Sequence, residues 1–208
     1  MDIKITAKML NDVGKKIIYN KNKLEEVVPD FQNYYVLKKA EDKWVYGLFM
    51  QEGNNQPYLK SDEQFLKESE ASKYFFLKQL SRFYFNTIIK SFIQKHPALG
   101  IGRPQFDEES LLNSFKSAGI PKEILSKEKD NKMSVSIEEK GDKYIVVYYG
   151  NGGKEINSTY PIAKSQALFL AFRKGFLLHL YETRVKDLLR KNGLKDEITD
   201  KDINIFIT

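Results

Sequence analysis

The chain has few side chains that could carry out catalysis, and the pair with the clearest chemistry is Arg173 and His179. Cysteine is absent, and the histidines are His96 and His179 alone. Arg173 and His179 lie six positions apart in a long predicted helix. An imidazole can exchange a proton with a substrate, and a guanidinium can stabilise a negatively charged transition state. Together they would suit chemistry at a phosphodiester.

The spacing of Arg173 and His179 resembles that of HEPN-type ribonucleases, in which a helical arginine and histidine act at a phosphodiester. The resemblance covers this motif alone and implies a ribonuclease with these two residues in its active site. On an ideal α-helix, however, positions six apart point about 120° away from each other. The hairpins predicted elsewhere in the chain also differ from an all-helical nuclease. A HEPN-like ribonuclease is therefore the third hypothesis.

Other polar motifs favour structural roles. The stretch Tyr149–Lys154 lacks the spacing of a P-loop, and its Asn-Gly-Gly sequence is typical of a hairpin turn. Adjacent carboxylates such as Glu138 and Glu139 point apart on a strand, so they do not form an acid/base pair. The acidic residues near the C-terminus lack the order of a calcium-binding loop. We expect no catalytic residue, no metal site and no cofactor.

Bulk composition is that of an ordinary globular protein. Of 208 residues, 41% are hydrophobic and 30% are charged, and the net charge is +6. The absence of cysteine suits a reducing compartment. The first residues lack the apolar segment of a secretory signal, and no apolar run is long enough for a transmembrane helix. We expect a basic, cytoplasmic protein without a transmembrane segment.

Basic and aromatic side chains are interleaved in the first predicted hairpin, within residues 34–51. Rings and lysines exposed on a sheet are a common way to bind single-stranded nucleic acid. The same residue types also form strands well, and their rings can fill a core. Nucleic-acid binding is the alternative function. The residues proposed for it are Tyr34, Tyr35, Lys38, Lys39, Lys43 and Trp44.

The elements that would position these residues occur twice in the same order. A strand predicted at 43–49 follows Glu41-Asp42, and one at 143–149 follows Gly141-Asp142. Each is followed by a long apolar helix, within 71–95 and 161–192. The hairpins repeat after 100 residues and the helices after 93, which aligns Phe83 with Phe176. Weaker patterns predict short strands at 3–5 and 203–207, and a short helix at 23–28.

These patterns predict an α+β fold, a tandem repeat of two α-β-β(-β)-α units packed through their long helices. The first unit spans 1–98, a linker rich in glycine and proline spans 99–106, and the second unit spans 107–208. The long helices carry more apolar side chain than a small sheet can cover, so we expect an interface around Phe83 and Phe176.

The scarcity of catalytic groups favours binding over catalysis. The leading hypothesis is a non-enzymatic intracellular protein-binding protein, an accessory, inhibitor or immunity-type factor. Its partner would be another protein or a second copy of the chain.

Overall fold

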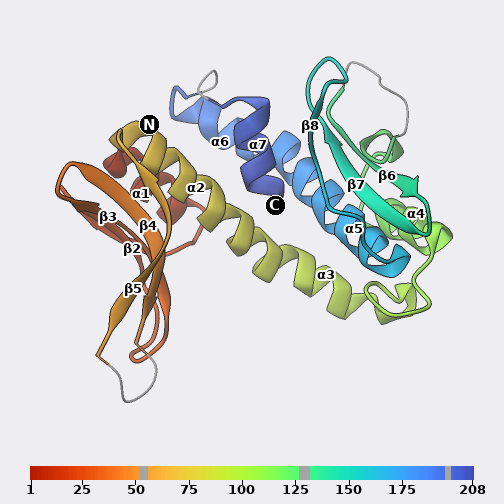
Figure 1. The fold of residues 1–208 in the computed structure, drawn as a ribbon, viewed down its shortest axis with the longest axis horizontal. Coiled ribbons are helices and arrows are strands. Elements are labelled where there is room, and N and C mark those ends of the chain that lie inside the picture. Colours follow the sequence, from red (N-terminus) through yellow and green to blue (C-terminus); the bar gives the residue numbers. More distant parts are fainter. Residues whose placement is uncertain (52–55, 127–131, 195–197) are drawn as a thin grey trace. The chain divides into compact units, whose positions relative to one another are not determined.

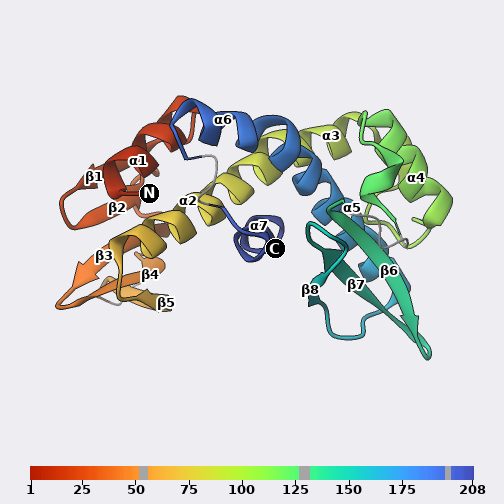
Figure 2. The ribbon, with the colours of Figure 1, turned by 90° about the horizontal axis from the view of Figure 1, so that it is seen from above.

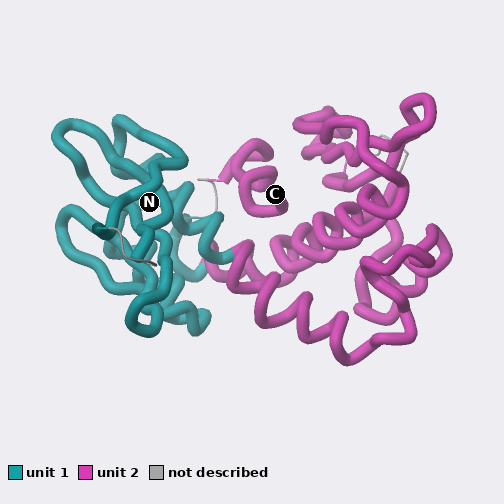
Figure 3. Tube along the Cα trace, turned by 60° about the horizontal axis from the view of Figure 1, so that its bottom comes forward, with its two compact units in different colours: residues 1–80, 191–197 teal, residues 81–190, 198–208 magenta. Residues whose placement is uncertain are grey.

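The computed structural model describes residues 1–51, 56–126, 132–194 and 198–208. It confirms a mixed α+β fold. Contacts divide the chain into two compact units, coloured separately in Figure 3. Unit 1 comprises residues 1–80 and 191–197, and unit 2 comprises residues 81–190 and 198–208. The long helix α2 (Glu68–Tyr84) begins in unit 1 and ends in unit 2, so the contacts do not follow the linker expected at 99–106.

Unit 1 is built on an antiparallel meander of five strands in the order β1-β2-β3-β4-β5 (Figure 1). Helix α1 (Ile3–Asp12) packs against β1 and β2. The first part of α2 contacts β4, where the ring centroids of Phe75 and Tyr46 are 6.1 Å apart. The strands are β1 (Ile17–Asn20), β2 (Lys23–Glu26), β3 (Tyr34–Ala40), β4 (Lys43–Met50) and β5 (Tyr58–Phe65).

Strand alternation explains which residues of this sheet form the core. Leu24 pairs with Leu37, and Leu37 pairs with Tyr46, so the three side chains share one face. All three are buried. On the opposite face Val36 is buried, but Tyr34, Lys38 and Val45 are only half-buried. One face therefore supplies the core beneath the helices.

Unit 2 contains a three-stranded antiparallel sheet in the order β6-β7-β8. Helix α5 lies along this sheet and contacts β6, β7, α4 and α7 (Figure 2). The strands are β6 (Ser134–Lys140), β7 (Lys143–Tyr149) and β8 (Glu155–Ser158). The helices of this unit include α3 (Lys90–Lys95), α4 (Glu108–Ser117), α5 (Lys164–Leu180) and α7 (Asp200–Ile207), and α6 (Lys186–Lys191) follows α5.

The core of unit 2 is a cluster of phenylalanine rings around Phe172, which is fully buried. Phe92, at the end of the first long helical segment, lies 6.2 Å from Phe172 and 5.6 Å from Phe176 between ring centroids. Phe106 and Phe115 contact Phe172 from other sides. These rings confirm that the long helical segments pack on each other, within unit 2.

Both long helices contain a π-helical turn at the same relative position. Each turn, Phe85–Ile89 and Tyr181–Val185, follows a helix of 17 residues and precedes a helix of six. The Thr87 hydroxyl donates to the carbonyl of Phe83 at 2.6 Å, and that of Thr183 to His179 at 2.8 Å. A hydroxyl that competes for a helical carbonyl favours such a distortion.

The π-turns correct the helix register expected from sequence. The second turn lies 96 residues after the first, from 85 to 181, and not 93. Within the predicted repeat, this offset would align Phe83 with His179 and not with Phe176. The apolar positions misled the alignment because both helices are apolar around most of their circumference.

The helices that begin each half also match. Both α1 and α4 have ten residues, and each is capped by an aspartate that accepts from a backbone N–H, Asp2 from Ile5 and Asp107 from Ser110. Each ends at a glycine with positive φ, Gly14 or Gly119. The duplication itself stays a prediction.

Three local predictions are wrong. Residues 3–5 open α1 because the Asp2 side chain caps it, and residues 203–207 lie in α7, which Thr199 and Asp202 cap reciprocally. Residues 23–28 do not form a helix, because Lys23–Glu26 is β2 and pairs on both sides. Among the residues described, no helix combines the length and apolar character that crossing a bilayer requires.

Candidate functional site

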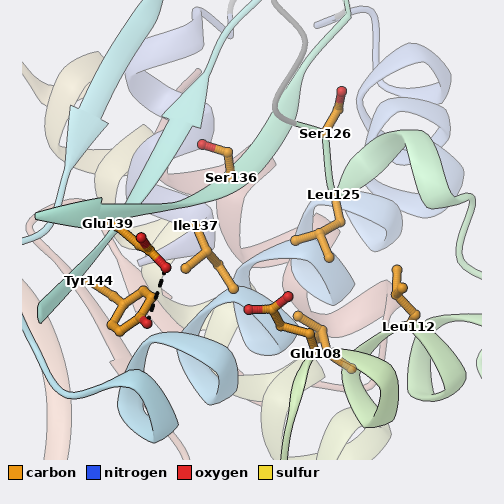
Figure 4. Close-up of a pocket in the computed structure, with 9 residues that line it drawn as sticks. Glu108, Leu112, Leu125, Ser126, Ser136, Ile137, Glu139 and Tyr144 are labelled. Carbon is orange, nitrogen blue, oxygen red and sulfur yellow. Dashed lines mark hydrogen bonds between the residues drawn. The ribbon is translucent and has the colours of Figure 1, made fainter. Parts of the chain in front are cut away.

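A cavity beside β6 is the candidate site in unit 2 (Figure 4). It has a volume of about 290 Å³ and lies between α4 and the outer edge of β6. Leucine and isoleucine make up four of its nine lining residues, while Glu108 and Glu139 add exposed carboxylates. The lining residues are Glu108, Leu111, Leu112, Leu125, Ser126, Ser136, Ile137, Glu139 and Tyr144.

Local sequence explains how the two sides of this cavity form. Asp107 caps α4, and hydrogen bonds from Ser110 lower the pKa of its carboxyl group. The helix then presents Leu111 to the core and leaves Leu112 half-exposed, at 50%. On the other side, the two-residue turn Gly141-Asp142 fixes the register of β6 on β7, from Ser134 opposite Tyr149 to Lys140 opposite Lys143.

The outer edge of β6 is the second feature of the site. Of the described strands, only β7 pairs with β6 along its length. On the other side, a single parallel bridge joins Leu125 to Val135. Beyond that bridge, at Ile137–Glu139, no described strand continues the sheet. A strand edge of this kind presents main-chain N–H and C=O groups that a further strand can pair with.

The charged groups at the cavity are held in a local network. Glu108 accepts from the Lys164 ammonium at 3.2 Å, and this bond raises the pKa of Lys164. The same ammonium lies 5.6 Å from the centre of the Tyr144 ring, and the Tyr144 hydroxyl donates to Glu139 at 3.3 Å (Figure 4). These contacts fix the rim. Ser136, which also lines the cavity, donates from its hydroxyl to the Glu138 carboxylate at 3.3 Å, and none of the described lining residues is a histidine.

Glu138, on the other face of β6, is also fixed. It accepts a hydrogen bond from the Tyr149 hydroxyl at 2.7 Å, and this bond, with burial, raises the pKa of Tyr149. Glu138 and Glu139 therefore point to opposite faces and make no acid/base pair, as the sequence predicted. Both leave negative charge beside the unpaired edge.

A second cavity, of about 420 Å³, contains His179. Burial and the charge of Arg184 lower the pKa of this imidazole. Lys186 and Glu182 also line the cavity, but they form an ion pair with each other at 2.7 Å. Of the described lining residues, His179 is the one histidine, and no second histidine or cysteine lies beside it in the cavity.

Arg173 does not join His179. Its guanidinium donates to the Thr208 carbonyl at 2.5 Å and lies over the Phe85 ring. Burial lowers the pKa of Arg173. The pair that resembles a HEPN-type ribonuclease is thus divided between different contacts. Among the described residues, no group of three or more His, Cys, Asp or Glu could hold a metal ion.

The structure separates the residues proposed for nucleic-acid binding. Trp44 is 4% exposed and shares its sheet face with Lys39, its cross-strand partner. Lys38 and Lys43 belong to the opposite face, the one with Tyr34. Tyr35 stacks on the core residue Tyr46, with 5.6 Å between ring centroids. Three of the six residues, Tyr34, Lys38 and Lys43, remain together on one accessible face.

The residues proposed for an interface lie in different surroundings. Phe176 is 5% exposed and contacts Phe92 and Phe172, so it belongs to the core of unit 2. Phe83 is half-buried and contacts Tyr84.

Sequence reasoning missed the cavity beside β6. The alternation of Met133, Val135 and Ile137 with polar residues predicts a strand here, but nothing in it says which edge of the strand is covered. The signal that could have found the site is Leu112, an apolar residue on the polar side of α4.

Comparisons of the chain with models of protein families, with curated proteins and with solved structures find no match.

Proposed function

We propose that this chain is a non-enzymatic protein-binding protein that holds its partner at the cavity between α4 and β6. The observation that carries the proposal is an apolar cavity placed directly at a strand edge that no described strand covers. Proteins commonly bind peptide segments at such edges, where main-chain bonds add affinity and the adjacent pocket adds specificity. An accessory, inhibitor or immunity-type role fits this mode of binding, and a cytoplasmic location is part of the proposal.

The physical argument for a protein partner rests on the character of the cavity. Leu112 is 50% exposed and lines the same cavity as Ile137, so covering both would remove apolar surface from water. The charged rim then restricts which partner can approach. The carboxylates at the cavity accept from Lys164, from Tyr144 and from Ser136, and none of the described lining residues is a histidine that could relay a proton, which favours binding over catalysis.

Affinity capture tests the proposal. The full chain would be immobilised and incubated with a nuclease-treated lysate, in parallel with Leu112→Asp and with Tyr160→Asp. Tyr160 belongs to the same unit, is 90% exposed and does not line the cavity, so it is a matched control. We expect a protein captured by the wild type and by Tyr160→Asp to be lost with Leu112→Asp. Equal capture by all three would contradict the proposal.

Nucleic-acid binding is the second candidate function. The observation that favours it is that Lys38, Lys43 and the ring of Tyr34 share the face of the first sheet opposite its core. Binding there should weaken as salt rises, and Lys38→Gln or Lys43→Gln should each lower the log-log salt slope by about one. Lys39→Gln, on the other face, is the control. Fluorescence anisotropy with single-stranded RNA measures this, and no binding at physiological salt would remove this candidate.

A further inference from the structure

The cavity in unit 2 lies where unit 1 has a strand. In unit 1, β2 covers the outer edge of β3, with Leu24 opposite Leu37 and Lys23 opposite Lys38. The hairpins β3–β4 and β6–β7 have equivalent registers 100 residues apart, because Ala40 pairs with Lys43 and Lys140 pairs with Lys143. Ile137 is thus the counterpart of Leu37. Its outer side faces the cavity and not a described strand.

The helices on the other side of the two sites also correspond. Helices α1 and α4 have the same length and caps 105 residues apart, from Asp2 to Asp107, which makes Leu112 the counterpart of Ala7. Ala7 and Leu37 are each 0% exposed, as is Leu24 of β2. Leu112 is 50% exposed, and Ile137 is half-buried. The helix face and the hairpin edge are buried in unit 1, where α1 packs on β1 and β2, and the corresponding positions of unit 2 are only partly covered.

We infer that an extended segment of a partner protein adds to β6 as an antiparallel strand and places an apolar side chain between Ile137 and Leu112, where β2 has Leu24. This inference rests on the proposed function and names the kind of segment that the site takes. A partner helix would not serve, because its main-chain groups are already bonded to one another and could not pair with the strand edge.

The hydrogen bonds of unit 1 give the register. The Lys39 N–H donates to the Asn22 carbonyl at 2.8 Å, so Lys39 and Leu37 direct their main-chain groups toward β2. Their counterparts are Glu139 and Ile137, whose main-chain groups would bond to the partner. The partner's apolar residue then lies opposite Ile137.

Charge defines the flanking residues of the segment. Where unit 1 has Lys38 and Lys39 on the strand, unit 2 has Glu138 and Glu139. Lys164 pairs with Glu108, whereas Glu139 and Glu138 accept from the neutral hydroxyls of Tyr144 and Tyr149, which leave their negative charge for the partner. We expect lysine or arginine at the two positions that precede the apolar residue, opposite Glu139 and Glu138.

The experiment uses a synthetic probe built on the chain's own β2. The probe copies residues 20–26 and carries Asn22→Lys, so that lysines face Glu139 and Glu138 and the leucine faces Ile137. It would be titrated into the full isotope-labelled chain, and backbone amide resonances would be followed by NMR, which also detects weak binding. We expect saturable shifts of the Ile137 and Glu139 amides and about tenfold slower hydrogen exchange at both.

Two altered probes test the mode of binding. Replacing the leucine of the probe with aspartate should weaken binding about tenfold or more, because burial of a leucine is worth roughly 1.5–3 kcal/mol. N-methylation of the same leucine keeps the side chain but removes its N–H, and should also abolish the slowed exchange. On the protein, Leu112→Asp should lose binding and Tyr160→Asp should keep it.

The outcomes separate this inference from the proposed function. If the probe leaves Ile137 and Glu139 unperturbed, or if the N-methylated probe binds as well as its parent, strand addition is overturned. Capture of a protein that depends on Leu112 would still stand in that case. If sedimentation shows a dimer that Leu112→Asp dissociates, the occupant is a second copy and the inference is again wrong.

Discussion

The two halves of this chain build a similar helix and hairpin and differ in what lies at the edge of the hairpin. In the first half, β1 and β2 extend the sheet to five strands, and α1 packs on them. In the second half, the sheet has three strands, and a cavity separates α4 from β6. A strand edge and an apolar helix face are thus satisfied within the chain in one half, and are left to a partner in our proposal for the other.

The comparison teaches that the same local elements can give a closed core or a binding site. The positions that decide are few. Leu24 and Ile17 belong to strands that cover the edge in unit 1, whereas among the described residues the outer edge of β6 has the single bridge from Leu125 to Val135. A covered edge is also protected from non-specific association, whereas an open edge needs flanking charge to limit it. Glu138 and Glu139 supply such charge at the open edge.

The largest effects should come from the phenylalanines that occupy matching positions in the long helices. Phe76 and Phe172 lie 96 residues apart and are both 0% exposed. Each change to alanine should cost about 3–5 kcal/mol of unfolding free energy. Fluorescence of the single tryptophan, Trp44, reports unit 1 during urea unfolding, and amide resonances report unit 2. If either change lowers the free energy of unfolding by less than about 1 kcal/mol, then aligning the two helices 96 residues apart does not pair one core position with another.

The covered and open edges should respond differently to a charge. Ala7 is fully buried, so Ala7→Asp should cost about 3 kcal/mol because an unpaired carboxylate is buried. Leu112→Asp should cost less than about 1 kcal/mol because the side chain is half-exposed. Urea unfolding followed in both units measures the difference. If both changes lower the free energy of unfolding equally, then the position of Leu112 is as well covered as that of Ala7.

The hairpins should differ at Gly47 and its counterpart Val147. A side-chain carbon at Gly47 would lie within 2.2 Å of the Lys60 carbonyl oxygen of β5, whereas Val147 is accommodated and buried. Gly47→Ala should therefore cost about 1–3 kcal/mol through overpacking.

The adjacent change Val45→Ala is the control, since it alters the same strand without the close approach to β5. A smaller loss with Gly47→Ala than with Val45→Ala would contradict this account of the sheet.

The smallest effect should be a pH dependence confined to the second half. The folded-state pKa of His179 is lowered by burial and by Arg184, so the unfolded chain binds the proton more readily. His179 therefore contributes a loss of stability as pH falls through the ordinary histidine range, near about 6.5, toward its lowered value. His179→Phe installs the residue of the first half, Phe83, and should make stability less steep over that range.

His96→Gln serves as the control for histidine content. Thermal unfolding between neutral pH and the lowered pKa would compare the three proteins. A pH dependence unchanged by His179→Phe would assign the titration to other groups.

Sequence predicted the hairpins and the long helices well because their signals are local. Two-residue turns at Glu41-Asp42 and Gly141-Asp142 join alternating segments, and the long helices have broad apolar faces. It failed at Lys23–Glu26, where four residues become a strand only because β1 and β3 bond to both sides. It failed again at 203–207, where alternating isoleucines suggested a strand and a capped helix forms.

The sequence by itself determined the α+β class, the order of the main elements, the absence of cysteine and the glycine turn between β7 and β8. Only the tertiary structure decided that Trp44 is buried and that Leu112 and Ile137 line a cavity. It also decided that Arg173 donates a hydrogen bond to Thr208 and does not lie with His179 in one site. The physical reason is that turns, caps and periodicity act between near neighbours in the chain. Whether an apolar residue is covered depends on segments far away in sequence, such as β2 in the first half, and a pattern of apolar residues is the same whether or not that cover is present.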